Sequence, residues 1–331
     1  MALEKYKNLL KQYLETEDEA ALYRADQFSK KSLMDDISPD EILQIHIDAM
    51  LDLYPDLSKD MRLSLDFLLE TMISYGIAHQ EFRVLREKQL ELKSEIEVAA
   101  NMQSTLLNTN IPEVEGLDIG AISIAANQMS GDYYHFIKDQ EDNVGIGVAD
   151  VIGKGIPAAL CMSMIKYALD SFPANRLNPK TILRLLNRVV ERNVEPGMFI
   201  TMFYGFYNKN ENCLQYASAG HEPGLFYNAK TDSFETLEAK GIVLGVEDSI
   251  SYNQFTKCLS VGDMIILLTD GVTECRKGDQ FIETDEILQV IKEYLHLPAQ
   301  DIVENVYRHF ERVQDFDLRD DFTLIILRRK E

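Results

Sequence analysis

The chain has 331 residues, of which 46% are hydrophobic and 27% are charged. This length and balance are typical of a globular protein with two domains and exclude a disordered or fibrous chain. The net charge of −22 at pH 7 repels polyanions, so nucleic acid is not an expected partner.

The cysteines and the apolar runs exclude further classes. The sequence contains neither a C-x-x-C nor a C-x5-R motif, which excludes a metal knuckle and a cysteine phosphatase loop. We expect four reduced core cysteines: Cys161, Cys213, Cys258 and Cys275. The first residues carry charges instead of an apolar signal core, and no apolar run approaches the roughly 18 residues of a membrane span. We therefore expect a cytoplasmic protein with no membrane partner.

The first part of the chain, up to about residue 110, has the apolar spacing of helices and predicts about four of them. The sequence SPDE, from Ser38 to Glu41, predicts a capping box with proline at the first helical position, and Ser58 predicts the start of another helix. We assign residues 1–84 to a helical regulatory domain for dimerisation and partner binding.

The next segment can be read in heptads. The seam positions are Phe82, Leu85, Gln89, Leu92, Ile96, Ala99, Gln103 and Leu106. Two polar seam residues weaken a coiled coil while fixing its register and partner number. A parallel two-stranded coil and one amphipathic helix packed on its own domain both fit this pattern. We assign residues 85–110 to a helical, coiled-coil-like linker.

After Pro112 glycines become frequent and β-type runs appear, at residues 117–126, 144–150, 199–208, 214–220, 263–270 and 322–328. Helical stretches are predicted at residues 157–170, 179–193, 285–294 and 299–314. Because the strands come in sequential groups, they favour antiparallel sheets with helices outside over a parallel sheet. We therefore predict an α+β protein whose second domain, residues 111–331, is a β-sandwich flanked by helices.

The stretch VADVIGKGIPAAL, from Val148 to Leu160, has a glycine loop before a predicted helix. It resembles part of a phosphate-binding loop, but a Walker motif requires G-x4-G-K-[S/T]. Gly147 is one residue too far from Gly153, and Gly155 replaces the hydroxyl residue that would hold magnesium. The spacing therefore argues against a nucleotide-binding loop.

Aspartates stand beside several predicted strands: Asp132, Asp150, Asp270, Asp320 and Asp321. Aspartate is a poor strand residue, and any one of these alone would be read as part of a solvated turn. Together they indicate an all-oxygen site, since carboxylates converge only where a cation screens their repulsion. Such ligands select magnesium or manganese, and two such ions can activate water and hold a phosphate.

Seven motifs occur in the order found in one known family: EIEVAANMQSTLL, SGDYYHF, VADVIGKGIPAAL, FITMFYGFYN, YASAGHEPGLFY, LLTDGVTE and RDDFTLIIL. From about Ile96 to the C-terminus the chain resembles the PPM-type metal-dependent serine/threonine phosphatases, specifically their bacterial SpoIIE branch. The helical N-terminal region is similar in layout to that of stress-response phosphatases in this branch. The resemblance implies a PPM-type fold and a metal-dependent protein phosphatase.

The resemblance also implies a role for each aspartate in binding two Mn²⁺ or Mg²⁺ ions. Asp150 would bridge the ions, while Asp132 and the Val151 carbonyl would hold one of them. Asp270 and Asp320 would hold the other. Asp321 would be an occasional ligand or would support the ligands. The same four aspartates, Asp132, Asp150, Asp270 and Asp320, are the catalytic residues that the resemblance implies.

Two positions depart from the family pattern. Ser130 stands where the branch has the first glycine of G-G-D, and its Cβ would slightly restrict the turn. His135 stands where the branch has an aspartate, and we expect a surface residue or one behind the ligands. His221, on a glycine-flanked turn, is expected to stabilise that turn rather than to act as a general acid.

The resemblance further implies a substrate and an activator. The substrate would be a serine-phosphorylated anti-sigma factor antagonist, a small STAS-domain protein, whose dephosphorylation activates a general stress sigma factor by partner switching. The activator would be a kinase-like switch protein that binds the N-terminal domain of a homodimer. Two alternatives stay open on the residues alone, namely a phosphoesterase for small molecules and a non-catalytic signalling scaffold.

Overall fold

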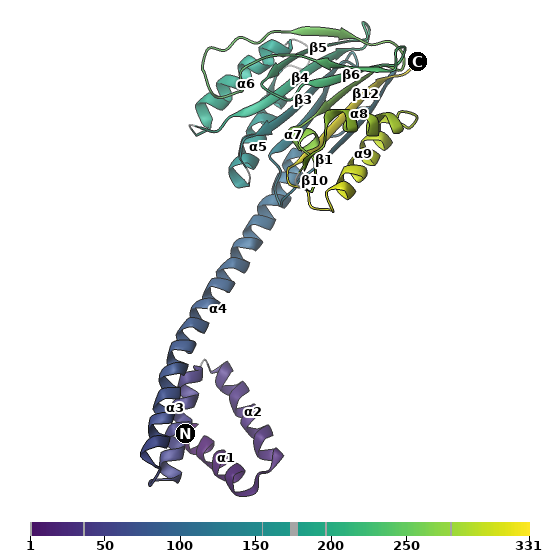
Figure 1. Ribbon diagram of the computed structural model, residues 1–331. Helices are drawn as coiled ribbons and strands as arrows, with labels where there is room; N and C mark the ends of the chain where they lie inside the picture. The colour runs from purple at the N-terminus through teal and green to yellow at the C-terminus, as the bar shows by residue number, and fades with distance from the viewer. Residues whose placement is uncertain (1, 36, 154, 173–177, 196, 279) are drawn as a thin grey trace. The chain divides into compact units, whose positions relative to one another are not determined.

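A computed structural model of the protein describes residues 2–35, 37–153, 155–172, 178–195, 197–278 and 280–331. The chain forms two compact units, residues 1–94 and residues 95–331 (Figure 1). The first unit contains helices α1 (Ala2–Thr16), α2 (Glu19–Met34) and α3 (Pro39–Leu53), and the beginning of α4 (Lys59–Leu107). The second contains the end of α4 and all of the strands.

The predicted helix starts in the first unit are confirmed. Ser38 Oγ accepts a hydrogen bond from the Glu41 backbone N–H at 3.3 Å, and Glu41 Oε2 accepts one from the Ser38 N–H at 3.0 Å. Ser58 Oγ likewise accepts from the Met61 N–H at 3.3 Å. Each side chain satisfies a backbone donor that the first helical turn leaves unpaired, which fixes where the helix begins.

Helix α4 is continuous over 49 residues, from Lys59 to Leu107, and most of the predicted linker lies inside it. The segment has no proline, and Gly76 is its only glycine, so nothing in the sequence interrupts it. Among the described residues, no helix combines the length and apolar character that a bilayer crossing demands.

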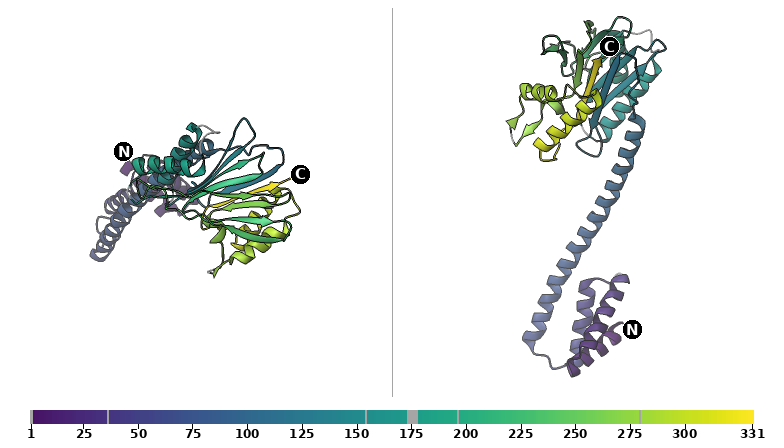
Figure 2. Two further views of the ribbon diagram at one scale, coloured as in Figure 1. Left: turned by 90° about the horizontal axis from the view of Figure 1, so that it is seen from above. Right: turned by 90° about the vertical axis from the view of Figure 1, so that its right-hand side faces the viewer.

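The second unit is a sandwich of two antiparallel sheets (Figure 2). One sheet has the order β1 (Leu117–Ile124), β12 (Phe322–Arg329), β9 (Met264–Leu268), β6 (Gly224–Asn228) and β7 (Ser233–Leu237). The other has the order β2 (Asp132–Lys138), β3 (Val144–Val151), β4 (Ile200–Asn208), β5 (Cys213–Ala219) and β8 (Phe255–Cys258). The short pair β10 (Arg276–Lys277) and β11 (Gln280–Phe281) lies outside both.

Helices cover the outer faces of the sandwich, which confirms the predicted fold class. Helices α5 (Ile156–Ser171) and α6 (Pro179–Asn193) pack on the β2–β8 sheet through a buried cluster that includes Met162 and Leu186. Helices α8 (Thr284–Glu293) and α9 (Ala299–Val313) pack on the other sheet. A third cluster fills the space between the sheets and includes Ile146, Phe203 and Ile325. Successive residues of each central strand therefore point alternately to the core between the sheets and to the core beneath the helices.

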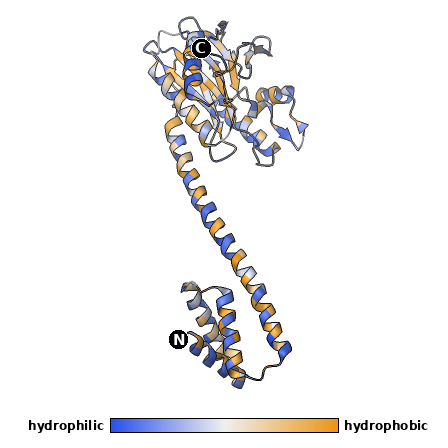
Figure 3. Ribbon diagram, turned by 90° about the vertical axis from the view of Figure 1, so that its left-hand side faces the viewer, coloured by the Kyte–Doolittle hydropathy of each residue, from blue (hydrophilic) through white to orange (hydrophobic). Residues whose placement is uncertain are grey.

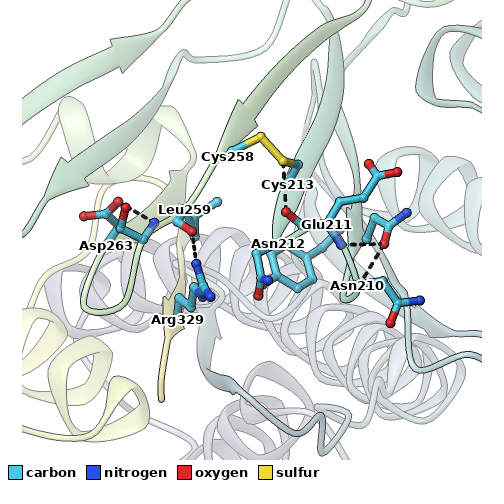
Figure 4. The surroundings of a disulfide bond; sticks show 11 residues. Asn210, Glu211, Asn212, Cys213, Cys258, Leu259, Asp263 and Arg329 are labelled. Carbon is cyan, nitrogen blue, oxygen red and sulfur yellow. Dashed lines mark hydrogen bonds between the residues drawn. A yellow bond between two sulfur atoms is a disulfide. The ribbon is translucent and has the colours of Figure 1, made fainter.

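The expectation that all four cysteines are reduced is wrong. Cys213 on β5 and Cys258 on the edge strand β8 are directly opposed and form a disulfide (Figure 4). Cys161 and Cys275 are free and buried, as expected. The pair lies 45 residues apart in the sequence, so only the strand pairing brings the two sulfur atoms together.

Candidate active site

Asp132 and Asp150 meet where β2 begins and β3 ends. They are direct cross-strand partners, and Asp150 is also paired with Thr201 on β4. Directly opposed residues of antiparallel strands project to the same face of a sheet, so the two carboxylates lie close together. The strand pairing thus joins two of the predicted ligands.

Asp132 connects the two sheets. Its side chain is 4% exposed, and its Oδ2 accepts hydrogen bonds from the hydroxyls of Thr269 at 2.6 Å and Thr323 at 2.7 Å. Burial, and then the negative charge of Asp150, raise the pKa of Asp132 well above its ordinary value, although the two threonine bonds oppose this. A bound cation would offset this cost and keep the carboxylate ionised.

Asp321 organises the turn that precedes Asp132. Its Oδ1 accepts from the Ala126 N–H at 2.8 Å, and its Oδ2 accepts from the Gly131 N–H at 2.6 Å. The Ser130 hydroxyl lies 3.0 Å from the same Oδ2 and also accepts from the Asp132 N–H at 3.1 Å. Ser130 is not among the residues with a positive φ, and its hydroxyl adds hydrogen bonds that a glycine could not make.

Asp270 and Asp320 are brought together by a close contact of two backbones. Asp270 begins the short helix α7 (Asp270–Thr273), and Gly271 lies against the segment of Asp320 and Asp321. A Cβ on Gly271 would lie 1.9 Å from the Asp321 carbonyl oxygen, so only glycine fits. Since Thr269 bonds to Asp132, the four predicted aspartates belong to one connected region between the ends of the two sheets. We call this the aspartate region; it contains Asp132, Asp150, Asp270 and Asp320.

The donors in this region fit hard divalent cations. A Cβ on Gly131 would lie 3.3 Å from the carbonyl oxygens of Val151 and Gly153 and 3.6 Å from Asp150 Oδ1, so these oxygens face one small space. Within the described part of the chain, no three acidic, histidine or cysteine side chains surround a single point. An ion here would rely on backbone carbonyls and water as well as carboxylates, as magnesium commonly does.

The sequence interpretation missed the role of Gln103, which reaches this region from the end of α4. Its side chain is 7% exposed; Nε2 donates to the Ser130 carbonyl at 2.6 Å, and Oε1 accepts from the Ser130 N–H at 3.1 Å. A glutamine among apolar seam residues was the sequence feature that could have indicated this role. The heptad pattern instead predicted that Gln103 would face a second linker helix. A cavity of about 320 Å³ lies beside this contact and extends to Asp132.

Thr269, Thr323 and Glu222 were also missed. The threonines lie near the ends of two β-type runs, where threonine is an ordinary residue, so nothing local distinguishes them. Burial, followed by the charges of Asp270 and Glu274, raises the pKa of Glu222, which places this carboxyl near the aspartate region. Glu222 follows His221 directly in the motif GHEP, which is the local signal for it.

His221 stabilises its turn, as predicted. Its backbone N–H donates to Ser218 Oγ at 3.1 Å, and its Nδ1 lies 2.9 Å from Thr201 Oγ1, the cross-strand neighbour of Asp150. Burial lowers the pKa of His221 to about 4, so the ring is neutral at pH 7. A neutral imidazole cannot serve as a general acid at that pH.

His135 is not a surface residue, contrary to one of the two expectations. It is buried beneath α5, where Nδ1 lies 2.7 Å from the Tyr133 hydroxyl. Its Nε2 lies 3.1 Å from Asp170 Oδ1, outside the geometry of a hydrogen bond. Burial lowers the pKa of His135 to about 4 even though Asp170 opposes the shift.

We expect this depressed pKa to make stability fall in acid. The unfolded chain protonates His135 near pH 6.5, whereas the folded chain does so only near pH 4, so stability is lost as the pH falls between these values. Between about pH 7.5 and about pH 5, the wild type should lose about 2 kcal/mol more than His135→Gln. Urea denaturation of both proteins at the two pH values measures the difference. Equal losses in the two proteins would contradict a neutral His135.

Comparison with known proteins covers both units. Residues 140–330 match the SpoIIE family, described as Stage II sporulation protein E, and residues 4–78 match the N-terminal domain family of the phosphoserine phosphatase RsbU. The chain is 54% identical to phosphoserine phosphatase RsbU of Bacillus subtilis over 99% of its own length and 97% of that protein.

Solved structures have the same fold in the second unit. The RsbU and RsbW domains of a Mycobacterium tuberculosis protein match with a TM-score of 0.58 and 26% identity, over 68% of this chain and 62% of that one. The SiaA PP2C domain of Pseudomonas aeruginosa matches with a TM-score of 0.61 and 18% identity, over 74% of this chain and 98% of that one. The chain therefore belongs to the family of phosphoserine phosphatases that includes RsbU and has a SpoIIE-type catalytic domain.

Proposed function

We propose that the chain removes phosphate from a phosphoserine of an anti-sigma factor antagonist, a small STAS-domain protein, and so activates a general stress sigma factor in the cytoplasm. The observation that carries this proposal is the connected region of Asp132, Asp150, Asp270 and Asp320 in a chain 54% identical to RsbU. The Mycobacterium tuberculosis relative, which has RsbU and RsbW domains in one protein, supports a partner-switching role.

Two Mn²⁺ or Mg²⁺ ions would bind in this region. Asp150 would bridge them, Asp132 and the Val151 carbonyl would complete one site, and Asp270 with Asp320 would complete the other. Such ions neutralise phosphate oxygens and lower the pKa of a water nucleophile. Asp321 keeps the Ser130–Asp132 turn in place through its three donors and would serve as a ligand only occasionally.

The N-terminal unit would form a homodimer and receive a kinase-like activator. Support comes from the part of α4 inside that unit, along which hydrophobic positions recur (Figure 3). Its exposed large apolar side chains are Met61, Leu63, Phe67, Leu68, Tyr75 and Ile77. An exposed apolar surface of this kind marks a site of protein association. Residues 1–84 would be the dimerising domain and residues 85–110 the linker, pairing as a coiled coil when the activator binds.

One assay separates this proposal from its alternatives. We expect the purified chain to release phosphate from the serine-phosphorylated STAS protein with Mn²⁺, and to lose this activity in EDTA. Added p-nitrophenyl phosphate tests the competing small-molecule phosphoesterase. Hydrolysis of the small ester alone would favour that enzyme, and hydrolysis of neither compound would favour a signalling scaffold.

A further inference from the structure

Helix α6 carries a row of basic side chains on its solvent-facing side. Lys180, Arg184, Arg188 and Arg192 follow one another at intervals of four residues, and all four are exposed. We call these residues the α6 basic row. Four-residue spacing puts them on one face of the helix, over about 18 Å of its length.

The opposite face of α6 explains why the row points outward. Ile182, Leu183, Leu186 and Val190 are buried in the core against the β2–β8 sheet. The buried Asn187 donates to the Glu247 carbonyl at 2.7 Å and accepts from the Gly245 N–H at 2.9 Å, which fixes the rotation of the helix. The α6 basic row is therefore held rigidly toward solvent.

The α6 basic row is positively charged, whereas the chain as a whole is strongly negative. The sequence has 33 basic and 55 acidic residues, yet the exposed ionisable residues of α6 are the four cations and Glu191. Within the described ranges of the chain, no acidic side chain forms an ion pair with any of the four. An ordinary solvated helix face in so acidic a protein would carry both signs, with pairs at four-residue spacing.

The Arg192 end of the row is the end from which the chain continues toward the aspartate region. Helix α6 ends at Asn193, and the chain then enters β4 at Ile200, the cross-strand partner of Val151. The Phe199 carbonyl accepts a hydrogen bond from the Ile152 N–H at 3.1 Å, so this connection passes directly beside the end of β3. A protein whose phosphoserine entered the aspartate region would thus pass close to the Arg192 end of the row.

We propose that the α6 basic row binds an acidic face of the phosphoprotein substrate, outside the reaction centre. This inference rests on the proposed function, because the partner is taken to be that substrate. Complementary charge suits an acidic face of a protein. A nucleic acid or an anionic membrane would extend past the row and meet the negative surface of a chain with net charge −22.

The test uses the full chain with Asp150→Asn in Mn²⁺, which we expect to bind the substrate protein while hydrolysing it at least about 10³-fold more slowly. Dissociation constants for the serine-phosphorylated substrate protein are measured at low and high salt, with and without Arg184→Gln, Arg188→Gln and Arg192→Gln. We expect the triple change to weaken binding about 10-fold at low salt, and the difference to shrink at high salt. The matched control changes Lys230, Lys240 and Lys277, three exposed lysines outside α6, to glutamine, which alters net charge equally.

A second measurement addresses folding and the reaction centre. In a chain that keeps Asp150, the α6 triple variant should have the wild-type free energy of unfolding in urea, and any hydrolysis of p-nitrophenyl phosphate should run at the wild-type rate, because the small ester has no acidic face. The inference would be overturned if the control triple variant weakened substrate binding as much as the α6 triple variant, or if the α6 triple variant bound substrate as tightly as the unchanged row. It would also be overturned if the chain with an intact row did not bind the substrate protein. A different result would overturn the proposed function alone: the substrate protein binds, and binding depends on the α6 basic row, but the wild-type chain does not remove its phosphate.

Discussion

We expect Asp150→Asn to lower turnover of the phosphoprotein by about 10³-fold or more in Mn²⁺. Asp150 is the cross-strand partner of Asp132 and, with the carbonyl oxygens of Val151 and Gly153, faces the space beside Gly131. Asparagine keeps the shape of the side chain but removes the charge that would bridge two cations. The barrier therefore rises by several kcal/mol, because the ions are bound weakly or in the wrong place.

The same substitution should leave the fold intact. Asp132 and Asp150 repel one another in the absence of cations, which is one reason the pKa of Asp132 is raised. Neutralising one of them relieves that repulsion, so the free energy of unfolding in EDTA should stay equal or increase. Steady-state kinetics and urea denaturation measure the two effects, with the exposed Asp248→Asn as the matched control. Near wild-type turnover by Asp150→Asn would rule out a dinuclear site.

The second large effect is expected from Gln103→Leu, which should lower turnover about 10- to 100-fold. Leucine removes both hydrogen bonds to Ser130 and leaves a partly buried N–H and a partly buried carbonyl without these partners. The turn from Ser130 to Asp132 then relies on its bonds to Asp321 and on the hydrogen bond from the Val151 N–H to the Gly131 carbonyl. A small displacement of Asp132 is sufficient to disturb metal-dependent chemistry.

Gln89→Leu is the matched control, since it makes the same chemical change on an exposed face of the same helix. It should not lower turnover, and if the linkers pair as a coiled coil it should raise basal activity without the activator. The heptad pattern alone predicts that Gln103→Leu, like Gln89→Leu, raises basal activity. Because Gln103 contacts Ser130, we expect Gln103→Leu to lower activity instead. Unchanged turnover in Gln103→Leu, measured with the phosphoprotein and Mn²⁺, would show that the contact does not support the site.

Local features of the fold could be predicted from the sequence. The predicted helix at residues 179–193 matches α6 at both ends, and its start is marked by the Asn178 cap and Pro179. Six strands were predicted from their apolar runs, and β1, β3, β4, β5, β9 and β12 lie within or close to those runs. Strand β9 has only five residues, but all of them are apolar, whereas the equally short β6, β7 and β8 contain polar residues and were not predicted.

The candidate site could be predicted only in part, for a physical reason. Each aspartate stands beside a strand, and this is a local feature of the sequence. Its partners come from strands far away along the chain: Thr269 and Thr323 are 137 and 191 residues from Asp132. Contacts of this kind depend on sheet order and register, and the same limit hid the Cys213–Cys258 disulfide.

The Gln103 contact also determines where a catalytic fragment must begin. Composition changes at about residue 110, and a fragment cut there would start with the first strand intact. It would nevertheless lack the glutamine that holds the Ser130 backbone from the last turns of α4. The boundary of the compact unit, at residue 95, retains this helix end. A fragment that starts there keeps the end of α4 as an integral part of the enzyme's own architecture.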